Sequence, residues 1–372
     1  AFLGAALPGS ALAAGRPAAG VAARGHAQTG GSFRIATWIG YIDVDEYMAY
    51  PSLDRFTAET GVAIDYQEAV EDNESFFASD LRGPIEAGVP TGWDIVVLTD
   101  WMVQRLASLG WLEEIDTAST PSYPANLADV YRTRAWDPEN RLAAPWLSGI
   151  TGIGHDANVT WPLTSVASFF DPQWSGRTSY LSEMNDCVGL TALSQGADPS
   201  TLTEEQFDAA LAKIGEAIDT GIVRRMTGNS YVEDMATGDV VVAMAWSGDV
   251  LGLLVPDQRE DQDIRWVFPD EGAMLWTDNM VIPRGAENKA AAETFIDWYY
   301  RPENAGPIDA YVQYVSPVVG AGEVVAAIDP ALVENTAIFP TDEMRARLRA
   351  FISVEPDLRA QWEAAFASTI GL

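Results

Sequence analysis

The stretch "GWDIVVLTDWMVQRLASLGWL", residues 92–112, reads as a buried strand followed directly by a helix. Its first half holds an unbroken apolar run, typical of a strand covered on both faces. Its second half spaces its apolar residues as a helix does. Two similar units precede it: "FRIATWIGYI" (33–42) before a helical "SLDRFTAETGV" (52–62), and "VAIDYQEA" (62–69) before a helix through "NESFFASDLRGPIEAG" (73–88). This alternation predicts an α/β fold with a largely parallel sheet.

A second α/β unit begins near "RLAAPWLSGITGIGHDA" (141–157). It continues with a helix at 203–219, whose first turn is acidic, and with its clearest strand in "GDVVVAMAWSGD" (238–249). The strand "MLWTDNMVIP" (274–283) follows, and then a helix through "NKAAAETFIDWYY" (288–300). Two units of this kind predict a two-lobe molecule rather than one continuous core.

The C-terminal segments "TDEMRARLRAF" (341–351) and "PDLRAQWEAAFAS" (356–368) read as two amphipathic helices. The pattern therefore divides the chain into a lead over residues 1–32 and two α/β units.

Composition limits the classes of function. The chain has 372 residues and 48% hydrophobic residues, enough for two sizeable cores. Its formal net charge is −32, which excludes nucleic acid and anionic lipid as partners. The single cysteine, Cys187, allows no internal disulfide, and the two histidines, His26 and His155, lie far apart in the sequence. We therefore expect no zinc site, no histidine-based triad and no cofactor, and we expect His155 to be a strand-end residue.

Residues 1–32 consist almost entirely of alanine, glycine and other small residues. They resemble the end of a secretion signal followed by a flexible lead, and their apolar run is too short to span a bilayer. We expect the mature protein to start near Ser32 and to work in a periplasm. Because no cysteine lies nearby, we expect no lipid anchor.

Aromatic and acidic residues gather at the predicted strand ends, where ligands bind in parallel α/β sheets. One tryptophan there would usually pack in the core, but four of the thirteen occupy such positions. Asp278 interrupts an apolar strand beside Trp276, and a buried carboxylate needs a partner. Glu183 and Asp186 follow another strand at a helix start. The candidate ligand-binding residues are Trp38, Tyr41, Thr99, Trp101, Glu183, Asp186, Trp246, Trp276, Asp278 and Tyr314.

These residue types suit a ligand that is cationic and otherwise apolar. An ammonium group over an aromatic face gains ~0.5–2 kcal/mol, and carboxylates accept charge-assisted hydrogen bonds from its N–H groups. A linear aliphatic polyamine meets both conditions. The alternatives are another solute, such as a sugar, a ferric complex or an anion, and a carboxylate-based hydrolase. A hydrolase is less favoured because Glu183 and Asp186, three residues apart, are too close to flank a glycosidic bond.

Over residues 33–372 the chain resembles the polyamine-binding proteins (spermidine/putrescine class) of bacterial ABC importers. The motifs that carry the resemblance are "TWIGYI", "FTAETGVAIDYQEAVEDNE", "WDIVVLT", "GDVVVAMAWSG", "LWTDNMVIP" and "NKAAAETFIDWYYRPENA". The resemblance implies a two-lobe periplasmic-binding-protein fold of type II, with mixed, mostly parallel sheets and a hinge that closes over ligand. It also implies that each lobe is assembled from two stretches of the chain, and the expected bounds are 1–32 for the lead, 33–145 plus about 278–322 for lobe 1, and 146–277 plus about 323–372 for lobe 2. It further implies delivery to a membrane permease, a monomer and no catalysis.

The resemblance implies ligand contacts at the same ten residues. The matched positions are Trp38 and Tyr41 for an aromatic pair, Thr99 and Trp101 for a hydroxyl residue and an aromatic, Glu183 and Asp186 for an acidic-x-x-acidic helix start, and Trp246, Trp276, Asp278 and Tyr314 directly. Asp278 would then hold an amine while the indoles enclose the carbon chain.

Four departures from the family pattern concern the preferred polyamine. Ile39 and Gly40 stand where many relatives have a polar or acidic residue between the first tryptophan and tyrosine. Asn185 replaces an arginine, and Glu183 replaces a shorter aspartate. A C-terminal polar contact has no clear counterpart near Phe351.

Overall fold

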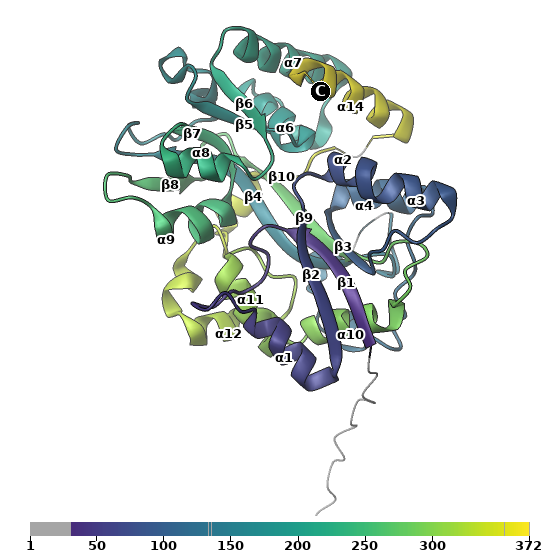
Figure 1. Cartoon of the computed structure of the whole chain (residues 1–372). Helices are drawn as coiled ribbons and strands as arrows, with labels where there is room; N and C mark the ends of the chain where they lie inside the picture. Colours follow the sequence, from purple (N-terminus) through teal and green to yellow (C-terminus); the bar gives the residue numbers. More distant parts are fainter. Residues whose placement is uncertain (1–30, 133, 135, 353, 372) are drawn as a thin grey trace, which may run out of the picture.

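In a computed structural model, the structure describes residues 31–132, 134, 136–352 and 354–371. The strands of this part join into one curled sheet in the order β2-β1-β3-β9-β4-β7-β5-β6, with β10 on β9 and β8 on β4 (Figure 1). The strands are β1 Gly31–Trp38, β2 Val62–Val70, β3 Ile95–Thr99, β4 Ala144–Asp156, β5 Thr178–Leu181, β6 Val223–Thr227, β7 Val242–Trp246, β8 Ile264–Val267, β9 Ala273–Val281 and β10 Leu348–Arg349.

Helices cover both faces of this sheet (Figure 1), so the predicted α/β fold is confirmed. The α-helices are α1 Pro51–Thr60, α2 Asn73–Phe76, α3 Arg82–Ala87, α4 Asp100–Ser108, α5 Ser122–Asn126, α6 Met184–Ser194, α7 Glu204–Asp219, α8 Tyr231–Thr237, α9 Val255–Asp257, α10 Lys289–Tyr299, α11 Pro302–Val312, α12 Ala321–Ile328, α13 Asp342–Arg347 and α14 Pro356–Ile370. Two π-helical segments, η1 Phe77–Leu81 and η6 Asp249–Leu254, extend α2 and precede α9. Short 3₁₀ turns occupy Asp129–Tyr131, Val166–Phe170, Pro172–Trp174, Pro199–Thr201 and Pro330–Glu334. No helix of the described chain is long and apolar enough to cross a membrane.

The sheet has two parallel parts joined by an antiparallel centre. β1 pairs in parallel with β2 and β3, and β5 pairs in parallel with β6 and β7. Between them β4 and β9 run antiparallel to each other, with Gly149 opposite Trp276 and Leu147 opposite Asp278. The two long strands therefore run from one half of the molecule into the other (Figure 1). The predicted lobe boundaries at 145/146 and 277/278 fall inside these two strands, the one near 322/323 falls inside α12, and all of them stay predictions.

Local sequence explains where the elements begin and end. α1 has a proline at its first position and ends at Gly61, which adopts the left-handed φ of 73° that the predicted stop requires. α7 begins with a capping box in which Thr203 and Gln206 bond each other's backbone. Every residue of β3 is buried, as its apolar run predicts. His155 lies buried near the end of β4, as expected, and its Nδ1 lies 2.7 Å from the hydroxyl oxygen of Thr160.

Two expectations need correction or lie outside the structure. The helix predicted over 341–351 ends early, because α13 stops at Arg347 and the next two residues pair with β9 as β10. The ladder bonds to β9 replace another helical turn and direct the chain toward the centre of the molecule. The lead predicted over 1–32 lies outside the described residues up to residue 30, and Gly31 and Ser32 are the first residues of β1.

Candidate functional site

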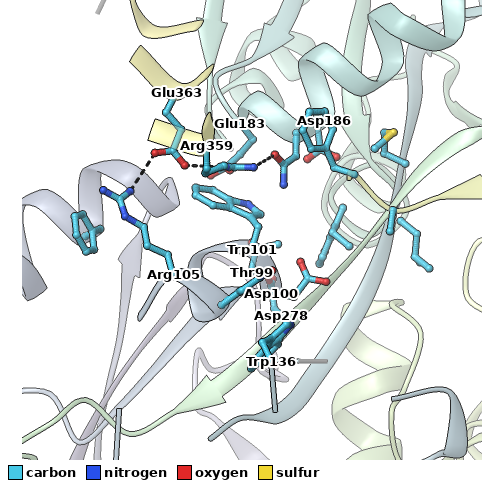
Figure 2. A pocket seen from close by; sticks show the side chains of 18 of the residues that line it. Thr99, Asp100, Trp101, Arg105, Trp136, Glu183, Asp186, Asp278, Arg359 and Glu363 are labelled. Carbon is cyan, nitrogen blue, oxygen red and sulfur yellow. Dashed lines mark hydrogen bonds and ion pairs between the residues drawn. The ribbon is translucent and has the colours of Figure 1, made fainter. Parts of the chain in front are cut away.

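A cavity of about 590 Å³ lies between the two halves of the molecule, at the carboxyl ends of several strands (Figure 2). Trp38 ends β1, Thr99 ends β3 and Trp246 ends β7, so the sheet delivers these side chains to one place. All ten residues singled out in the sequence line this cavity. The strand-end prediction is wrong for Trp276 and Asp278, which lie inside β9 and reach the cavity because this strand runs antiparallel to β3 and β4. Ligand contacts at the ten residues stay a prediction.

Five aromatic rings form a continuous wall along the cavity. Trp246 contacts Trp38 and Trp276 edge to face, with ring centroids 5.9 and 6.4 Å apart. Tyr314 continues the wall in the same manner, 5.0 Å from Trp276 and 5.8 Å from Tyr41. Each ring restricts the orientation of the next, because edge-to-face pairs have a defined geometry. The apolar wall is thus ordered before a ligand arrives.

Glycines on neighbouring elements leave the space that two of these rings occupy. A Cβ atom at Gly149, opposite Trp276 on β4, would lie 2.2 Å from the indole. A Cβ atom at Gly248 would lie 2.5 Å from the ring of Tyr314. The indole nitrogen of Trp276 donates a 3.0 Å hydrogen bond to Thr151, which fixes the ring from its other side.

Asp278 lies at the base of the cavity, paired across the sheet with Thr99 (Figure 2). Its side chain is 2% exposed, and its Oδ2 accepts a 2.6 Å hydrogen bond from the hydroxyl of Tyr41. Burial raises the pKa of this carboxyl to about 7, although hydrogen bonds with Tyr41 and Thr99 lower it. The other oxygen, Oδ1, accepts no hydrogen bond from the described residues. Asp278 therefore has a free acceptor for a donor or cation.

Glu183 and Asp186 stand at the start of α6, the strand-to-helix transition that the sequence predicts. The backbone and side-chain amides of Asn73 donate to Oε1 of Glu183 at 2.9 and 3.1 Å. Thr151 and the indole of Trp246 donate to the two oxygens of Asp186 at 2.7 and 3.0 Å. Burial raises the pKa of Glu183 to about 8 and that of Asp186 to about 6. Protein donors already hold both carboxyls, so they act chiefly as fixed acceptors.

The sequence analysis missed a further buried carboxyl, Asp249. Its Oδ2 accepts 2.9 Å hydrogen bonds from Asn229 and Tyr231, and its Oδ1 accepts a 3.4 Å bond from Tyr314. Burial raises its pKa to about 6. Asp249 lies three residues after Trp246 in "AMAWSGD", so the strand-end rule could have found it.

A polar bridge closes the mouth of the cavity between α4 and α14 (Figure 2). The guanidinium of Arg359 stacks on the ring of Trp101 at 4.4 Å, donates to Asn185 at 2.7 Å and forms an ion pair with Glu363. Glu363 also pairs with Arg105 of α4 at 3.3 Å. We call these four charged and aromatic residues, Trp101, Arg105, Arg359 and Glu363, the mouth bridge. Asn185, at the position where the resemblance expects an arginine, is thus the acceptor for an arginine from α14.

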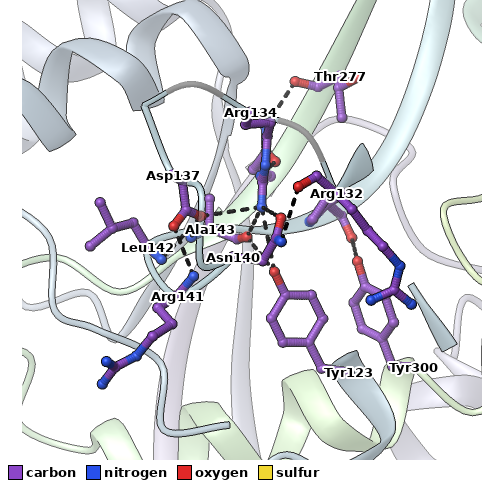
Figure 3. A network of polar contacts seen from close by, with 12 residues as sticks. Tyr123, Arg132, Arg134, Asp137, Asn140, Arg141, Leu142, Ala143, Thr277 and Tyr300 are labelled. Carbon is purple, nitrogen blue, oxygen red and sulfur yellow. Dashed lines mark hydrogen bonds and ion pairs between the residues drawn. The ribbon is translucent and has the colours of Figure 1, made fainter. Parts of the chain in front are cut away.

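A half-buried arginine, Arg134, anchors the loop that carries Trp136 to the cavity (Figure 3). Arg134 donates to Asn279 on β9 at 2.9 Å and to the carbonyl oxygen of Ala143 at 2.7 Å. It also pairs with Asp137 at 3.2 Å and lies over the Trp136 ring at 5.0 Å. The loop around Trp136 is therefore hydrogen-bonded to Asn279, the residue that follows Asp278 in β9. No pattern in the sequence connects this loop to β9.

The geometry combines an ordered aromatic wall with carboxyls whose pKa values are raised by burial. A cation entering the cavity would favour the ionised carboxylates and recover part of this cost. The described residues contain no group of three or more histidine, cysteine or acidic side chains that could hold a metal ion. The aromatic wall and the carboxyls together could accommodate an organic cation with an apolar body.

Comparisons with known proteins assign the chain to a family. The family described as bacterial extracellular solute-binding protein matches residues 52–340. The chain is 25% identical to the putrescine-binding periplasmic protein PotF of Escherichia coli over 318 residues, 82% of this chain and 83% of the relative. It is 26% identical to spermidine/putrescine-binding periplasmic protein 1 of Haemophilus influenzae over 306 residues, 80% of this chain and 79% of the relative.

Solved structures share the fold. The spermidine/putrescine ABC transporter substrate-binding protein PotD of Streptococcus pneumoniae superposes with a TM-score of 0.70 at 21% identity, covering 91% of this chain and 98% of that chain. The TpPotD lipoprotein of Treponema pallidum superposes with a TM-score of 0.73 at 19% identity, covering 92% and 100%.

Proposed function

Because the chain belongs to the family of bacterial extracellular solute-binding proteins, we propose that it captures an aliphatic polyamine of the putrescine or spermidine class. It then delivers this ligand to the permease of an ABC importer in the membrane. The curated relatives named for putrescine or spermidine binding support this ligand class.

The observation that carries the proposal is the free Oδ1 of Asp278 beside the aromatic wall. An ammonium group at this oxygen would gain a charge-assisted hydrogen bond, while its methylene chain packs on Trp246 and Trp276. The cavity volume of about 590 Å³ lies within the range of small-molecule sites and leaves room for an extended diamine or triamine.

The proposal includes the lobe division and the absence of catalysis. Lobe 1 (33–145 plus about 278–322) and lobe 2 (146–277 plus about 323–372) would move about the central strands β4 and β9 to admit and release ligand. Glu183 and Asp186 are engaged by protein donors, which suits fixed acceptors rather than a hydrolytic acid and base. We further propose that the protein is a periplasmic monomer.

Calorimetric titration of dialysed protein tests the ligand class. Putrescine and spermidine are expected to bind, whereas maltose and ferric citrate are expected to give no heat. The variant Asp278→Asn is expected to bind putrescine at least about tenfold more weakly, equal to about 1.4 kcal/mol.

The matched control is Asp208→Asn, which removes the same charge from the exposed face of α7. It should bind putrescine as the unaltered protein does. Unchanged affinity in Asp278→Asn would refute the anchor, and binding of maltose or ferric citrate alone would refute the ligand class.

A further inference from the structure

A hydrogen-bonded contact at the wall of the cavity joins the two parallel parts of the sheet. Asn73 begins α2, shortly after β2, and Glu183 lies directly before α6, shortly after β5. The backbone and side-chain nitrogens of Asn73 both donate to Oε1 of Glu183, at 2.9 and 3.1 Å. Asn73 is 0% exposed and Glu183 is 6% exposed, so water hardly competes for these bonds.

Thr99, at the end of β3, fixes the amide group of Asn73. The Nδ2 of Asn73 donates to the Thr99 hydroxyl at 2.9 Å, and its Oδ1 accepts from the Thr99 backbone at 3.0 Å. Asn73 thus uses both donors and the acceptor of its side chain. Its backbone N–H, which has no partner within the helix at the first position, is satisfied by Glu183. We call Asn73, Thr99 and Glu183 the clasp.

The backbones of the two parts meet beside the clasp. Gly228 follows β6, and a Cβ atom on it would lie 2.4 Å from the carbonyl oxygen of Glu71, which follows β2. Because this neighbour is backbone, it cannot turn aside as a flexible side chain could. A larger residue at position 228 would therefore push residues 71–73 away from the part of the sheet that carries Glu183.

The surroundings of Glu183 suit a hydrogen-bond acceptor better than a charged anchor. Burial first, and then the carboxylates of Asp72 and Asp186, raise the pKa of Glu183 to about 8. At neutral pH the carboxyl then keeps its proton in most molecules, and its carbonyl oxygen still accepts from Asn73. A neutral carboxyl attracts an ammonium group less strongly than a carboxylate does. The bonds to Asn73 therefore do not need the charge that an amine anchor would need.

We propose that Glu183 is a positioning residue, whose contact with Asn73 holds the two parts of the sheet together around the cavity, and not an anchor for the ligand's amine. The clasp is connected to the base of the cavity, because Thr99 lies opposite Asp278 in the sheet. Its effect on the ligand, which rests on the proposed function, is indirect: the apparent affinity falls in proportion to the fraction of molecules that are closed.

Hydrogen exchange of the unliganded protein, followed by mass spectrometry over residues 71–77, tests the clasp. Glu183→Ala removes the acceptor and Gly228→Ala forces the backbones apart, so both should raise the exchange rate of this segment at least about tenfold. Glu183→Gln keeps the acceptor oxygen, so the segment should exchange as slowly as in the unaltered protein. The matched controls are Glu205→Ala, at the exposed start of α7, and Gly215→Ala, whose Cβ atom would meet its nearest neighbour at 3.6 Å. Both should leave the rate unchanged.

Two results of this experiment would overturn the clasp. One is an unchanged exchange rate in Glu183→Ala. The other is a rate in Glu183→Gln as high as in Glu183→Ala, because the charge and not the acceptor would then hold the segment. The amides of β7 report on overall stability, and an equal acceleration there would show that the variants loosen the whole fold, which would also contradict the proposal.

Stopped-flow tryptophan fluorescence with putrescine tests the effect on the ligand. Glu183→Ala and Gly228→Ala should both raise the dissociation rate at least about tenfold, although Gly228 is not among the described residues that line the cavity. Faster dissociation in Glu183→Ala alone would show that Glu183 contacts the ligand and would overturn the proposal. If the unaltered protein does not bind putrescine, the proposed function fails, while hydrogen exchange in the unliganded protein still decides whether the clasp exists.

Discussion

At the scale of single residues, the buried carboxylate of Asp278 destabilises the unliganded protein when it is ionised. Burial raises its pKa from 3.8 to about 7, so between these two pH values the folded protein holds a proton that the unfolded chain has lost. The stability that this proton contributes is complete below pH 3.8 and is lost as pH rises through 7. Each pKa unit of difference between the folded and unfolded states changes the free energy of unfolding by about 1.4 kcal/mol, so this one carboxyl has a measurable effect on stability.

The variant Asp278→Asn should therefore stabilise the unliganded protein at high pH while it weakens ligand binding. We expect its melting temperature to exceed that of the unaltered protein by about 2–5 °C at pH 8, with a smaller difference at pH 5. Thermal unfolding followed by circular dichroism at the two pH values measures both differences. A melting temperature lowered equally at both pH values would show that Asp278 stabilises the fold and would contradict the argument.

The sequence located the carboxyls and rings of the cavity but not all of their partners. The strand-end rule holds for Trp246, which ends β7. Asp278 instead lies inside β9 and reaches the cavity because this antiparallel strand places it opposite Thr99, the last residue of β3. The same rule could have found Asp249, which follows β7. It could not have found Arg359, because an arginine on an amphipathic helix normally faces solvent. Only the tertiary packing of α14 places that guanidinium on Trp101.

At the scale of elements, the pairing of β4 with β9 controls the shape of the aromatic wall. Gly149 leaves the space that the Trp276 indole fills, and a Cβ atom there would lie 2.2 Å from the ring. We expect Gly149→Ala to push the indole into the cavity and to lower putrescine affinity at least about tenfold, because overpacking forces side chains out of their rotamers. The variant removes no polar contact, so the effect would belong to the wall alone.

Gly215→Ala is the matched control for this substitution. Gly215 lies within α7, and a Cβ atom there would meet its nearest neighbour at 3.6 Å, an ordinary contact. This variant should bind putrescine normally. Calorimetry measures both affinities, and tryptophan fluorescence reports the displaced indole. Normal binding in Gly149→Ala would mean that the Trp276 ring can move aside without any loss of putrescine affinity.

The mouth bridge links elements from the two halves. α14 packs on α7, where the rings of Phe207 and Trp362 stack 4.1 Å apart, and Glu363 reaches across to Arg105 of α4. The carboxylate of Glu363 is 15% exposed, so its pairing is less screened than a surface ion pair. We expect Glu363→Gln to raise the dissociation rate of putrescine severalfold and to change the association rate little.

Stopped-flow tryptophan fluorescence measures both rates for this variant. Glu323→Gln, an exposed substitution on α12, is the control with the same change in charge. A slower association with unchanged dissociation would show that Glu363 guides the ligand rather than holding the mouth closed.

Sequence patterns predicted most helices and strands, and the one clear error has a physical cause. The segment 341–351 has helical spacing, yet α13 ends at Arg347 because Leu348 and Arg349 pair with Ala273 and Met274 of β9. Periodicity cannot reveal a strand partner that lies about seventy residues away in the chain. That short pairing also carries Phe351 into the lining of the cavity.

At the scale of the whole molecule, the alternation of strands and helices predicted two α/β halves, and the structure shows how they share one sheet. The long strands β4 and β9 belong to both halves, with Leu147 opposite Asp278 near the middle. Length and composition could not show this, because a strand that crosses between halves has the same apolar pattern as one inside a half. The cavity lies between the halves because their strand ends face each other across this shared centre.

The net charge of −32 acts on the molecule as a whole and should give salt two opposite effects. Mutual repulsion among surface carboxylates opposes the compact state, so screening by salt should raise the free energy of unfolding of the unliganded protein. The same surface field attracts a polyamine from a distance, so screening should slow its association. Dissociation should change little, because the contacts inside the cavity are buried and poorly screened.

Between about 50 and 500 mM sodium chloride we expect the association rate of putrescine to fall at least about threefold while the unfolding midpoint in urea rises. Stopped-flow fluorescence and urea titration at the same salt concentrations measure the two trends. An association rate that does not depend on salt would show that the acidic surface does not attract the ligand and serves only solubility. An unfolding midpoint that falls with salt would show that stabilising ion pairs outweigh the repulsion among the carboxylates.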